Sequence, residues 1–125
     1  MRERLSGIKN VHLVPPADYS EFVWLMDRAD LILSDSGGVQ EEAPSLSKPV
    51  LVCRESTERP EALSAGATRL VGTVPSVVVP AVAELLTDED AYRKMQIEQN
   101  PYGDGRAAQR ILDEAVARLG PAIPQ

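Results

Sequence analysis

The residues best suited to bind a ligand lie in the stretch 34–42, Ser-Asp-Ser-Gly-Gly-Val-Gln-Glu-Glu. This stretch follows the apolar run 31–33 and precedes a helix-like segment that begins near Val39. A strand that passes through small residues into a helix presents free backbone N–H groups at the positive end of that helix, so the turn can hold a phosphate. Gly37 and Gly38 could also serve a plain tight connection, so an anion site and a simple turn both stay open here.

Two acids and an arginine favour a nucleotide-like ligand. Glu41 and Glu42 follow the glycines by about one helical turn, where one acid stabilises the helix N-terminus but a second would repel a bound phosphate. The conflict disappears if phosphates lie on the glycines while a carboxylate accepts hydrogen bonds from ribose hydroxyls. Arg59, in the polar loop 54–59, supplies a nearby positive charge after the next strand.

The surrounding sequence predicts short strands that alternate with helices. The strands are expected where short β-branched or aliphatic runs meet turn residues, at 10–14, 31–33, 50–53 and 68–71. Helices are expected at 19–29 after an N-cap at Asp18, at 39–46, 60–65 and 80–86, and in the segments 87–95 and 104–119. The last helix should bury an apolar face formed by Ala108, Ile111, Leu112, Ala115, Val116 and Leu119, and residues 121–125 should be loose.

This alternation predicts an α/β fold with a parallel sheet and right-handed crossovers. Ligands of such sheets bind outside the carboxyl ends of the strands. The glycine turn and the loop 54–59 both follow strands, so Arg59 and the backbone of Ser36, Gly37 and Gly38 are expected around one site. A chain of 125 residues suits a single domain, residues 1–125.

Composition excludes several functional classes. The formal charge is −6 and no Lys/Arg cluster occurs, which argues against nucleic-acid or anionic-membrane partners. Cys53 is the only cysteine, and the sequence has neither a signal-peptide pattern nor a membrane-length apolar run, so a cytoplasmic location is the simplest expectation. His12, the only histidine, is expected to pack in a strand. Because the sequence has no His/Cys cluster and no calcium-loop spacing of acids, we expect no metal.

Five blocks of sequence, in order, resemble the UDP-N-acetylglucosamine 2-epimerase family. They are residues 35–44 (DSGGVQEEAP), 48–52 (KPVLV), 57–62 (TERPEA), 70–73 (LVGT) and 100–105 (NPYGDG). The likeness covers nearly the whole chain, roughly residues 10–112, with the blocks in the family's order and spacing. It implies the nucleotide-binding half of a non-hydrolysing epimerase, a Rossmann-like α/β domain of the glycosyltransferase-B type.

The resemblance also implies roles for individual residues. The turn at residues 36–38 would hold the diphosphate of a UDP-sugar, Glu42 the ribose hydroxyls, Arg59 would lie by the phosphates and Phe22 by the uracil. Enzymes of this family eliminate UDP to form a 2-acetamidoglucal and then add it back with C2 inverted. They interconvert UDP-N-acetylglucosamine and UDP-N-acetylmannosamine for cell-surface polysaccharide synthesis, without a cofactor.

Length is the main departure from the family. A full member carries an N-terminal domain with the acids assigned to proton transfer, and a His-Arg-Arg-Glu-Asn stretch, and neither occurs in residues 1–125. We therefore expect a partial domain with no catalytic residue, inactive alone, and completed by an N-terminal domain or by a homo-oligomer. In the family the final helix returns toward the N-terminal domain, so its apolar face would be exposed here or covered by another chain. A hydrolysing epimerase, the nucleotide half of a sugar transferase and a non-catalytic nucleotide-binding module remain alternatives.

Overall fold

The computed structural model describes residues 2–120, and these residues form a three-stranded parallel sheet in the order β1-β2-β3. The strands are β1 (Ile32–Ser34), β2 (Val50–Val52) and β3 (Thr68–Leu70). Val50 of β2 lies opposite Ile32 of β1 and Thr68 of β3. The predicted parallel α/β fold is confirmed. The expected loose segment 121–125 lies outside the described residues.

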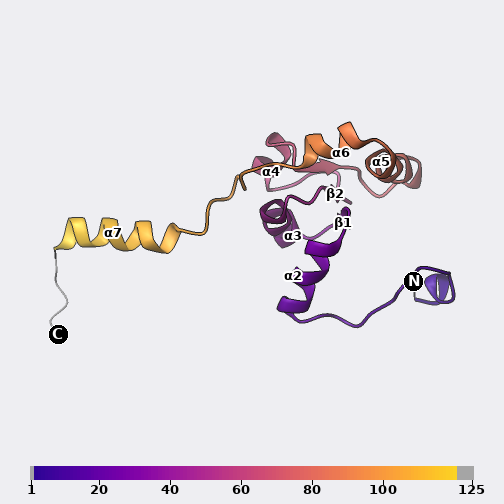
Figure 1. Ribbon diagram of the computed structural model, residues 1–125, viewed down its shortest axis with the longest axis horizontal. Helices are drawn as coiled ribbons and strands as arrows, with labels where there is room; N and C mark the ends of the chain where they lie inside the picture. Colours follow the sequence, from indigo (N-terminus) through magenta and orange to yellow (C-terminus); the bar gives the residue numbers. More distant parts are fainter. Residues whose placement is uncertain (1, 121–125) are drawn as a thin grey trace.

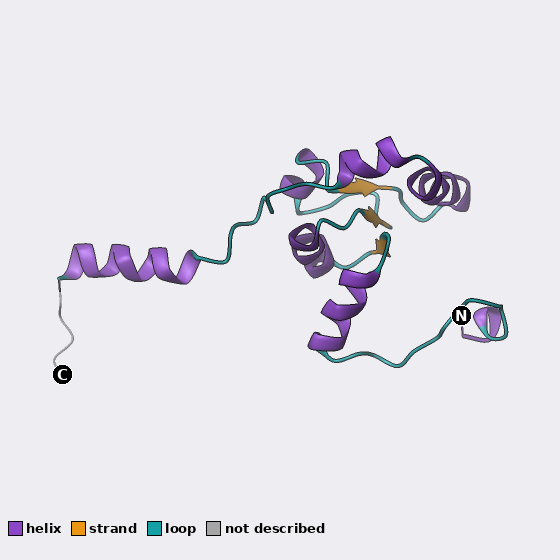
Figure 2. Ribbon diagram, viewed as in Figure 1, coloured by secondary structure: helices purple, strands orange, loops and turns teal. Residues whose placement is uncertain are grey.

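Helices connect and flank the strands (Figure 1; Figure 2). In chain order they are α1 (Arg2–Leu5), α2 (Tyr19–Arg28), α3 (Gly37–Glu42), the 3-10 helix η1 (Ala43–Leu46), α4 (Pro60–Ser64), α5 (Pro75–Thr87), α6 (Glu89–Met95) and α7 (Ala107–Leu119). The predicted helix at 39–46 thus begins two residues earlier than expected, at Gly37, and changes to 3-10 geometry around Pro44.

The middle strand β2 is the centre of the core, and all three of its residues are 0% exposed. Successive side chains of a strand point to opposite faces of the sheet, so β2 belongs to two apolar clusters. Val50 and Val52 pack with side chains from α2, α3 and η1, whereas Leu51 packs with side chains from α5 and α6. The continuous apolar run of β2 therefore reflects a strand that is covered on both sides.

Capping residues explain where several helices begin. The Asp18 carboxylate accepts a hydrogen bond from the Glu21 backbone N–H at 2.9 Å, which confirms the predicted start of α2. The cap of α6 is Asp88, whose carboxylate accepts hydrogen bonds from the Asp90 and Ala91 backbone N–H groups, so α6 begins at Glu89 within the predicted segment 87–95. The prediction that Pro80 begins a helix is wrong: α5 begins at Pro75, which suits a first helical turn, and Pro80 lies inside it.

The predicted strand at residues 10–14 is also wrong. Residues 11–17 have no regular secondary structure, and His12 is exposed on this loop instead of packed in a strand. The residues have β-branched character, but in the described chain no strand pairs with them, and β propensity mainly reflects packing against neighbouring strands. The lead-in before them contains the short helix α1, which was not predicted.

Helix α7 extends away from the rest of the described chain (Figure 1). Its sequence is amphipathic as predicted, but the expected burial of its apolar face is wrong: Ile111 is 69% exposed and Leu119 is 76% exposed. The exposed face agrees with the alternative that the family resemblance implied. Near its beginning, Arg110 forms a two-point ion pair with Asp104, at 2.8 Å and 2.7 Å.

Candidate functional site

The glycine turn lies at the carboxyl end of β1. Ser34 closes the strand, and its Oγ accepts a hydrogen bond from the Ser36 backbone N–H at 3.1 Å. Ser36 is the extended N-cap residue of α3, and within the described residues its hydroxyl makes no capping hydrogen bond. The exposed Ser36 hydroxyl and the first backbone N–H groups of α3 therefore remain available to a ligand.

Arg59 reaches across from the next loop and lies directly over Gly37. A Cβ atom built on Gly37 would come 2.7 Å from Arg59 Cζ, which is too close for two carbon atoms. At Gly38 the nearest atom to such a Cβ would be Glu42 Oε1, at an ordinary 3.7 Å. The structure thus brings the predicted arginine and the glycine turn together, and Gly37 is the glycine that makes this approach possible.

Two carboxylates hold the Arg59 guanidinium in this position. Arg59 Nε lies 2.5 Å from Glu41 Oε1, and Arg59 Nη1 lies 2.6 Å from Glu58 Oε1. Hydrogen bonding to Glu41 is the main reason why the pKa of Arg59 is raised. The sequence left open why two adjacent acids follow the glycines. In the structure Glu41 pairs with Arg59, so Glu42 is free for another role.

Glu42 lies on the α2 side of the turn. Its Oε2 atom is buried and has no hydrogen-bond partner among the described residues. Hydrogen bonding to Glu42, and then the negative charge of that carboxylate, raise the pKa of the nearby Tyr19. A cavity of about 160 Å³ lies here, lined by Tyr19, Val23, Met26, Glu42, Ser45 and Leu46. Glu42 is therefore a carboxylate with spare accepting capacity beside a small cavity.

Phe22 is not brought to this cavity. It is 39% exposed on α2, and the aromatic residue that lines the cavity beside Glu42 is Tyr19, one helical turn earlier. The sequence singled out only Phe22, although Tyr19, three residues earlier, lies on a similar side of α2. The uracil role of Phe22 stays a prediction, and Tyr19 is an additional candidate.

Gln40 is a buried polar residue that the sequence reasoning missed. It is 0% exposed, and its Nε2 donates to the Ser36 carbonyl at 3.3 Å. Its Oε1 accepts from the Thr57 hydroxyl at 2.7 Å, and Thr57 Oγ1 in turn accepts from the Arg59 backbone N–H at 3.1 Å. A line of hydrogen bonds therefore joins the glycine turn to the arginine loop.

The segment after α6 forms hydrogen bonds to both the α3–η1 segment and the loop that carries Arg59, and we call it the clamp. Asn100 Nδ2 donates to the Glu41 carbonyl at 2.8 Å and to Ser45 Oγ at 2.6 Å. The Tyr102 hydroxyl donates to the Arg59 carbonyl and accepts from the Ala62 backbone N–H, both at 3.3 Å. This segment thus ties the end of α3 to the beginning of α4.

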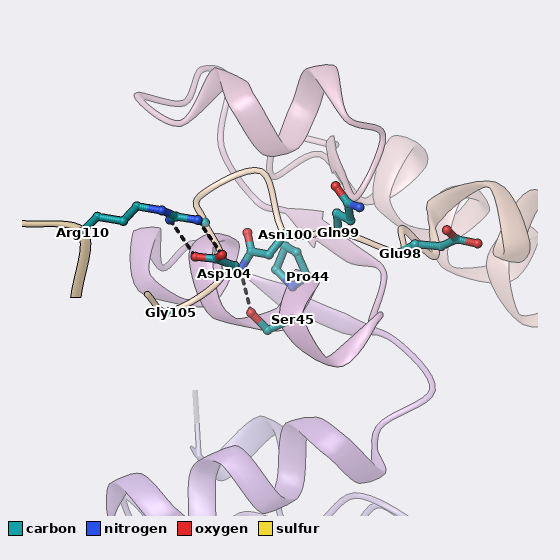
Figure 3. A pocket seen from close by; sticks show the side chains of 9 residues that line it. Pro44, Ser45, Glu98, Gln99, Asn100, Asp104, Gly105 and Arg110 are labelled. Atoms are coloured by element: carbon teal, nitrogen blue, oxygen red, sulfur yellow. Dashed lines mark hydrogen bonds and ion pairs between the residues drawn. The ribbon is translucent and has the colours of Figure 1, made fainter. Parts of the chain in front are cut away.

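A larger cavity of about 750 Å³ borders this clamp (Figure 3). Asn100, Ser45 and Asp104 line it, and Arg110 reaches in from the beginning of α7 to pair with Asp104. The cavity has a polar lining from the 98–105 segment and does not include Gly37, Glu42 or Arg59. The larger cavity and the candidate site at the glycine turn therefore have different linings, although Ser45 also lines the small cavity beside Glu42.

Comparisons with known proteins identify the family. The sequence profile of the family described as UDP-N-acetylglucosamine 2-epimerase matches residues 1–115. The chain belongs to the UDP-N-acetylglucosamine 2-epimerase family. It is 61% identical over 108 residues to the UDP-N-acetylglucosamine 2-epimerase of Yersinia pestis, a match that covers 86% of this chain and 29% of that protein.

Solved epimerase structures have the same fold. The Neisseria meningitidis UDP-GlcNAc 2-epimerase bound to UDP-GlcNAc superimposes with a TM-score of 0.87 at 46% identity, over 93% of this chain and 31% of that one. The Methanocaldococcus jannaschii enzyme, in complex with UDP-GlcNAc and UDP, gives a TM-score of 0.76 at 36% identity, over 92% and 30% of the two chains. The chain thus spans about a third or less of the epimerases that it matches.

Two further observations describe what the epimerase-family chain offers to ligands. Within residues 2–120, no three His, Cys, Asp or Glu side chains gather closely enough to hold a metal ion. None of the helices in the described part has the length and apolar content that a membrane crossing requires.

Proposed function

We propose that this chain is the UDP-sugar-binding portion of a non-hydrolysing UDP-N-acetylglucosamine 2-epimerase, with residues 1–125 forming one partial Rossmann-like domain. The observation that carries the proposal is the position of the Arg59 guanidinium over Gly37, at the carboxyl end of a parallel strand. A positive charge beside a glycine turn at this edge of a sheet suits a diphosphate. Family membership supports the same ligand class.

Each site residue has a role in this proposal. Ser36, Gly37 and Gly38 bind the diphosphate through the hydroxyl and the backbone amides at the start of α3. Arg59 compensates the phosphate charge, and Gly37 leaves room for its guanidinium. Glu42 accepts hydrogen bonds from the ribose hydroxyls, which is supported by its buried oxygen without a partner among the described residues.

The reaction itself needs groups from outside this site. In the epimerase reaction UDP is eliminated to give a 2-acetamidoglucal and is then added back to the other face of C2. In this proposal the acids and bases for proton transfer belong to the N-terminal part of a full-length epimerase, so we expect residues 1–125 alone to bind UDP without turnover. The apolar face of α7 would be covered by that part or by another copy of the chain, and the assembled enzyme would work in the cytoplasm.

Calorimetry with UDP tests the proposal on the chain as it stands. The unaltered chain should bind UDP, and Arg59→Ala and Glu42→Ala should each weaken binding by about 1–3 kcal/mol, the usual cost of a lost charge-assisted hydrogen bond. Arg69→Ala is the matched control, because Arg69 is also a partly exposed arginine in an ion pair, with Glu84, but belongs to β3 and α5 contacts instead of the turn. Equal UDP affinity in Arg59→Ala and Arg69→Ala would overturn the site assignment.

A further inference from the structure

We infer that Thr57 and Gln40 are positioning residues that set the Arg59 guanidinium over the glycine turn, and so control the affinity of this site for a nucleoside diphosphate. The inference rests on the proposed function. Neither residue need touch the ligand, because both act through Arg59 and the Ser36 carbonyl. Their hydrogen bonds form one line from the turn to the arginine: Ser36 carbonyl, Gln40 amide, Thr57 hydroxyl and Arg59 backbone N–H.

The donors and acceptors in this line fix its direction. Gln40 is 0% exposed, and its two amide atoms do different work: Nε2 donates to the Ser36 carbonyl while Oε1 accepts from Thr57. A hydroxyl has a single hydrogen, and Thr57 uses it on Gln40, so its oxygen is left to accept the Arg59 N–H. A flipped Gln40 amide would set Oε1 against the Ser36 carbonyl, two acceptors facing each other, so the observed orientation is favoured.

Side chains connect the glycine turn to the arginine loop, because the backbone pairing of the sheet ends before either segment begins. β1 pairs with β2 only as far as Ser34 and Val52, and the glycine turn and the arginine loop both begin beyond that register. Past this point, Gln40 is the buried side chain of α3 that bonds to the arginine loop. Gln40 and Thr57 therefore help to set the distance from the turn to the Arg59 backbone, together with Tyr102, whose hydroxyl donates to the Arg59 carbonyl.

Arg59 then has separate anchors for its backbone and for its side chain. Thr57 holds the backbone N–H and Tyr102 holds the backbone carbonyl, while Glu41 and Glu58 hold the guanidinium. Ion pairs that solvent still reaches, as around the 26% exposed Arg59 side chain, restrict a long side chain only modestly. Without the Thr57 hydroxyl, the Arg59 backbone can shift, and the guanidinium loses its place over Gly37 even though every charge is still present.

A pair of Thr57 variants tests the inference by calorimetry with UDP. Thr57→Val keeps the shape and removes the hydroxyl, and it should weaken UDP binding by about tenfold, the scale of one lost hydrogen bond. Thr57→Ser keeps the hydroxyl and should restore affinity to within about twofold of the unaltered chain. Thr57→Ala, which also lacks the hydroxyl, replaces Thr57→Val if circular dichroism shows that the valine variant does not fold.

The double variant separates a positioning role from a merely structural one. If Thr57 acts through Arg59, Thr57→Val combined with Arg59→Ala should bind UDP no more weakly than Arg59→Ala alone. Two results overturn the inference while the proposed function stands: unchanged affinity in Thr57→Val, or the same loss from Thr57→Val with and without Arg59. An unaltered chain that binds no UDP overturns the proposed function and this inference with it.

Discussion

The middle strand β2 and the final helix α7 have equally clear apolar patterns but opposite environments. All three residues of β2 are fully buried between two layers of helices, whereas the apolar face of α7 lies in the open, with Leu119 76% exposed. A period of apolar residues shows which face of an element requires burial. Whether the face is buried depends on a partner that its own sequence does not specify.

The candidate site and α7 differ in the same way, because the site lies on packed elements and α7 does not. Gly37, Arg59 and Glu42 lie on elements that pack around β2, and Gln40, Asn100 and Tyr102 tie those elements together. By contrast, the ion pair of Arg110 with Asp104 joins α7 to the preceding turn and lies with Asn100 along the larger cavity, whose lining does not include Gly37, Glu42 or Arg59. A binding site can therefore be complete at the carboxyl edge of the sheet although α7 is not packed.

The largest expected effect contrasts these two regions directly. Leu51→Ala should lower the free energy of unfolding by about 2–5 kcal/mol, because it leaves a cavity in a fully buried cluster. Leu112→Ala, a matched change on exposed α7, should alter it by no more than about 0.5 kcal/mol. Urea denaturation followed by circular dichroism measures both. Similar losses in the two variants would mean that α7 packs against the body in solution.

An intermediate effect is expected at the clamp, where the packed body ends. Tyr102→Phe removes a half-buried hydroxyl that bridges the Arg59 carbonyl and the Ala62 N–H, and it should cost about 1 kcal/mol of unfolding free energy. Thr73→Val is the control, since it also removes a hydroxyl but from an exposed loop residue. Urea midpoints of the two variants give the comparison, and a Tyr102→Phe midpoint equal to that of the control would contradict the clamp.

The smallest effect concerns the exposed ion pair at the beginning of α7. Hydrogen bonding to Arg110 lowers the pKa of the Asp104 carboxyl from its ordinary 3.8. A group with a lowered pKa stabilises the folded state above its unfolded pKa and loses that contribution as the pH falls through the folded value. The pair should therefore add a little stability above pH 3.8 and lose it below.

Arg110→Ala tests this prediction by carboxyl NMR. The Asp104 pKa in that variant should rise toward 3.8, while an Arg118→Ala variant, which removes a pair with Glu114 further along α7, should leave it unchanged. An unshifted Asp104 pKa in Arg110→Ala would show that the two-point pair does not persist in solution.

Local signals in the sequence were sufficient for much of the fold and part of the site. Asp18 with Glu21 begins α2, and Gly66, with its φ of +83°, follows the end of α4, because caps and left-handed turns depend on a few neighbouring residues. The shared location of Arg59 and Gly37 followed from the rule that loops after parallel strands meet at one edge.

The errors arose where the outcome depends on distant partners. Residues 10–14 have strand character but pair with no strand in the described chain, and Pro80 reads as a helix start until Pro75 is recognised as the first residue of α5. Gln40 looks like an ordinary polar helix residue, because its hydrogen bond to Thr57 spans 17 positions and exists only in the folded chain. The signal that could have pointed to this bond is that Gln40 lies in the block 35–44, and Thr57 and Arg59 lie in the block 57–62, two of the blocks that carry the family resemblance.

In the proposed function, the glycine turn and the arginine loop form one nucleoside diphosphate site on the packed body. Backbone amide NMR of the unaltered chain, titrated with UDP, tests it most directly. The largest shifts should occur at Ser36, Gly37, Gly38 and Arg59, with α7 unaffected. Shifts concentrated at the 98–105 cavity or on α7, or no shifts at all, would contradict it.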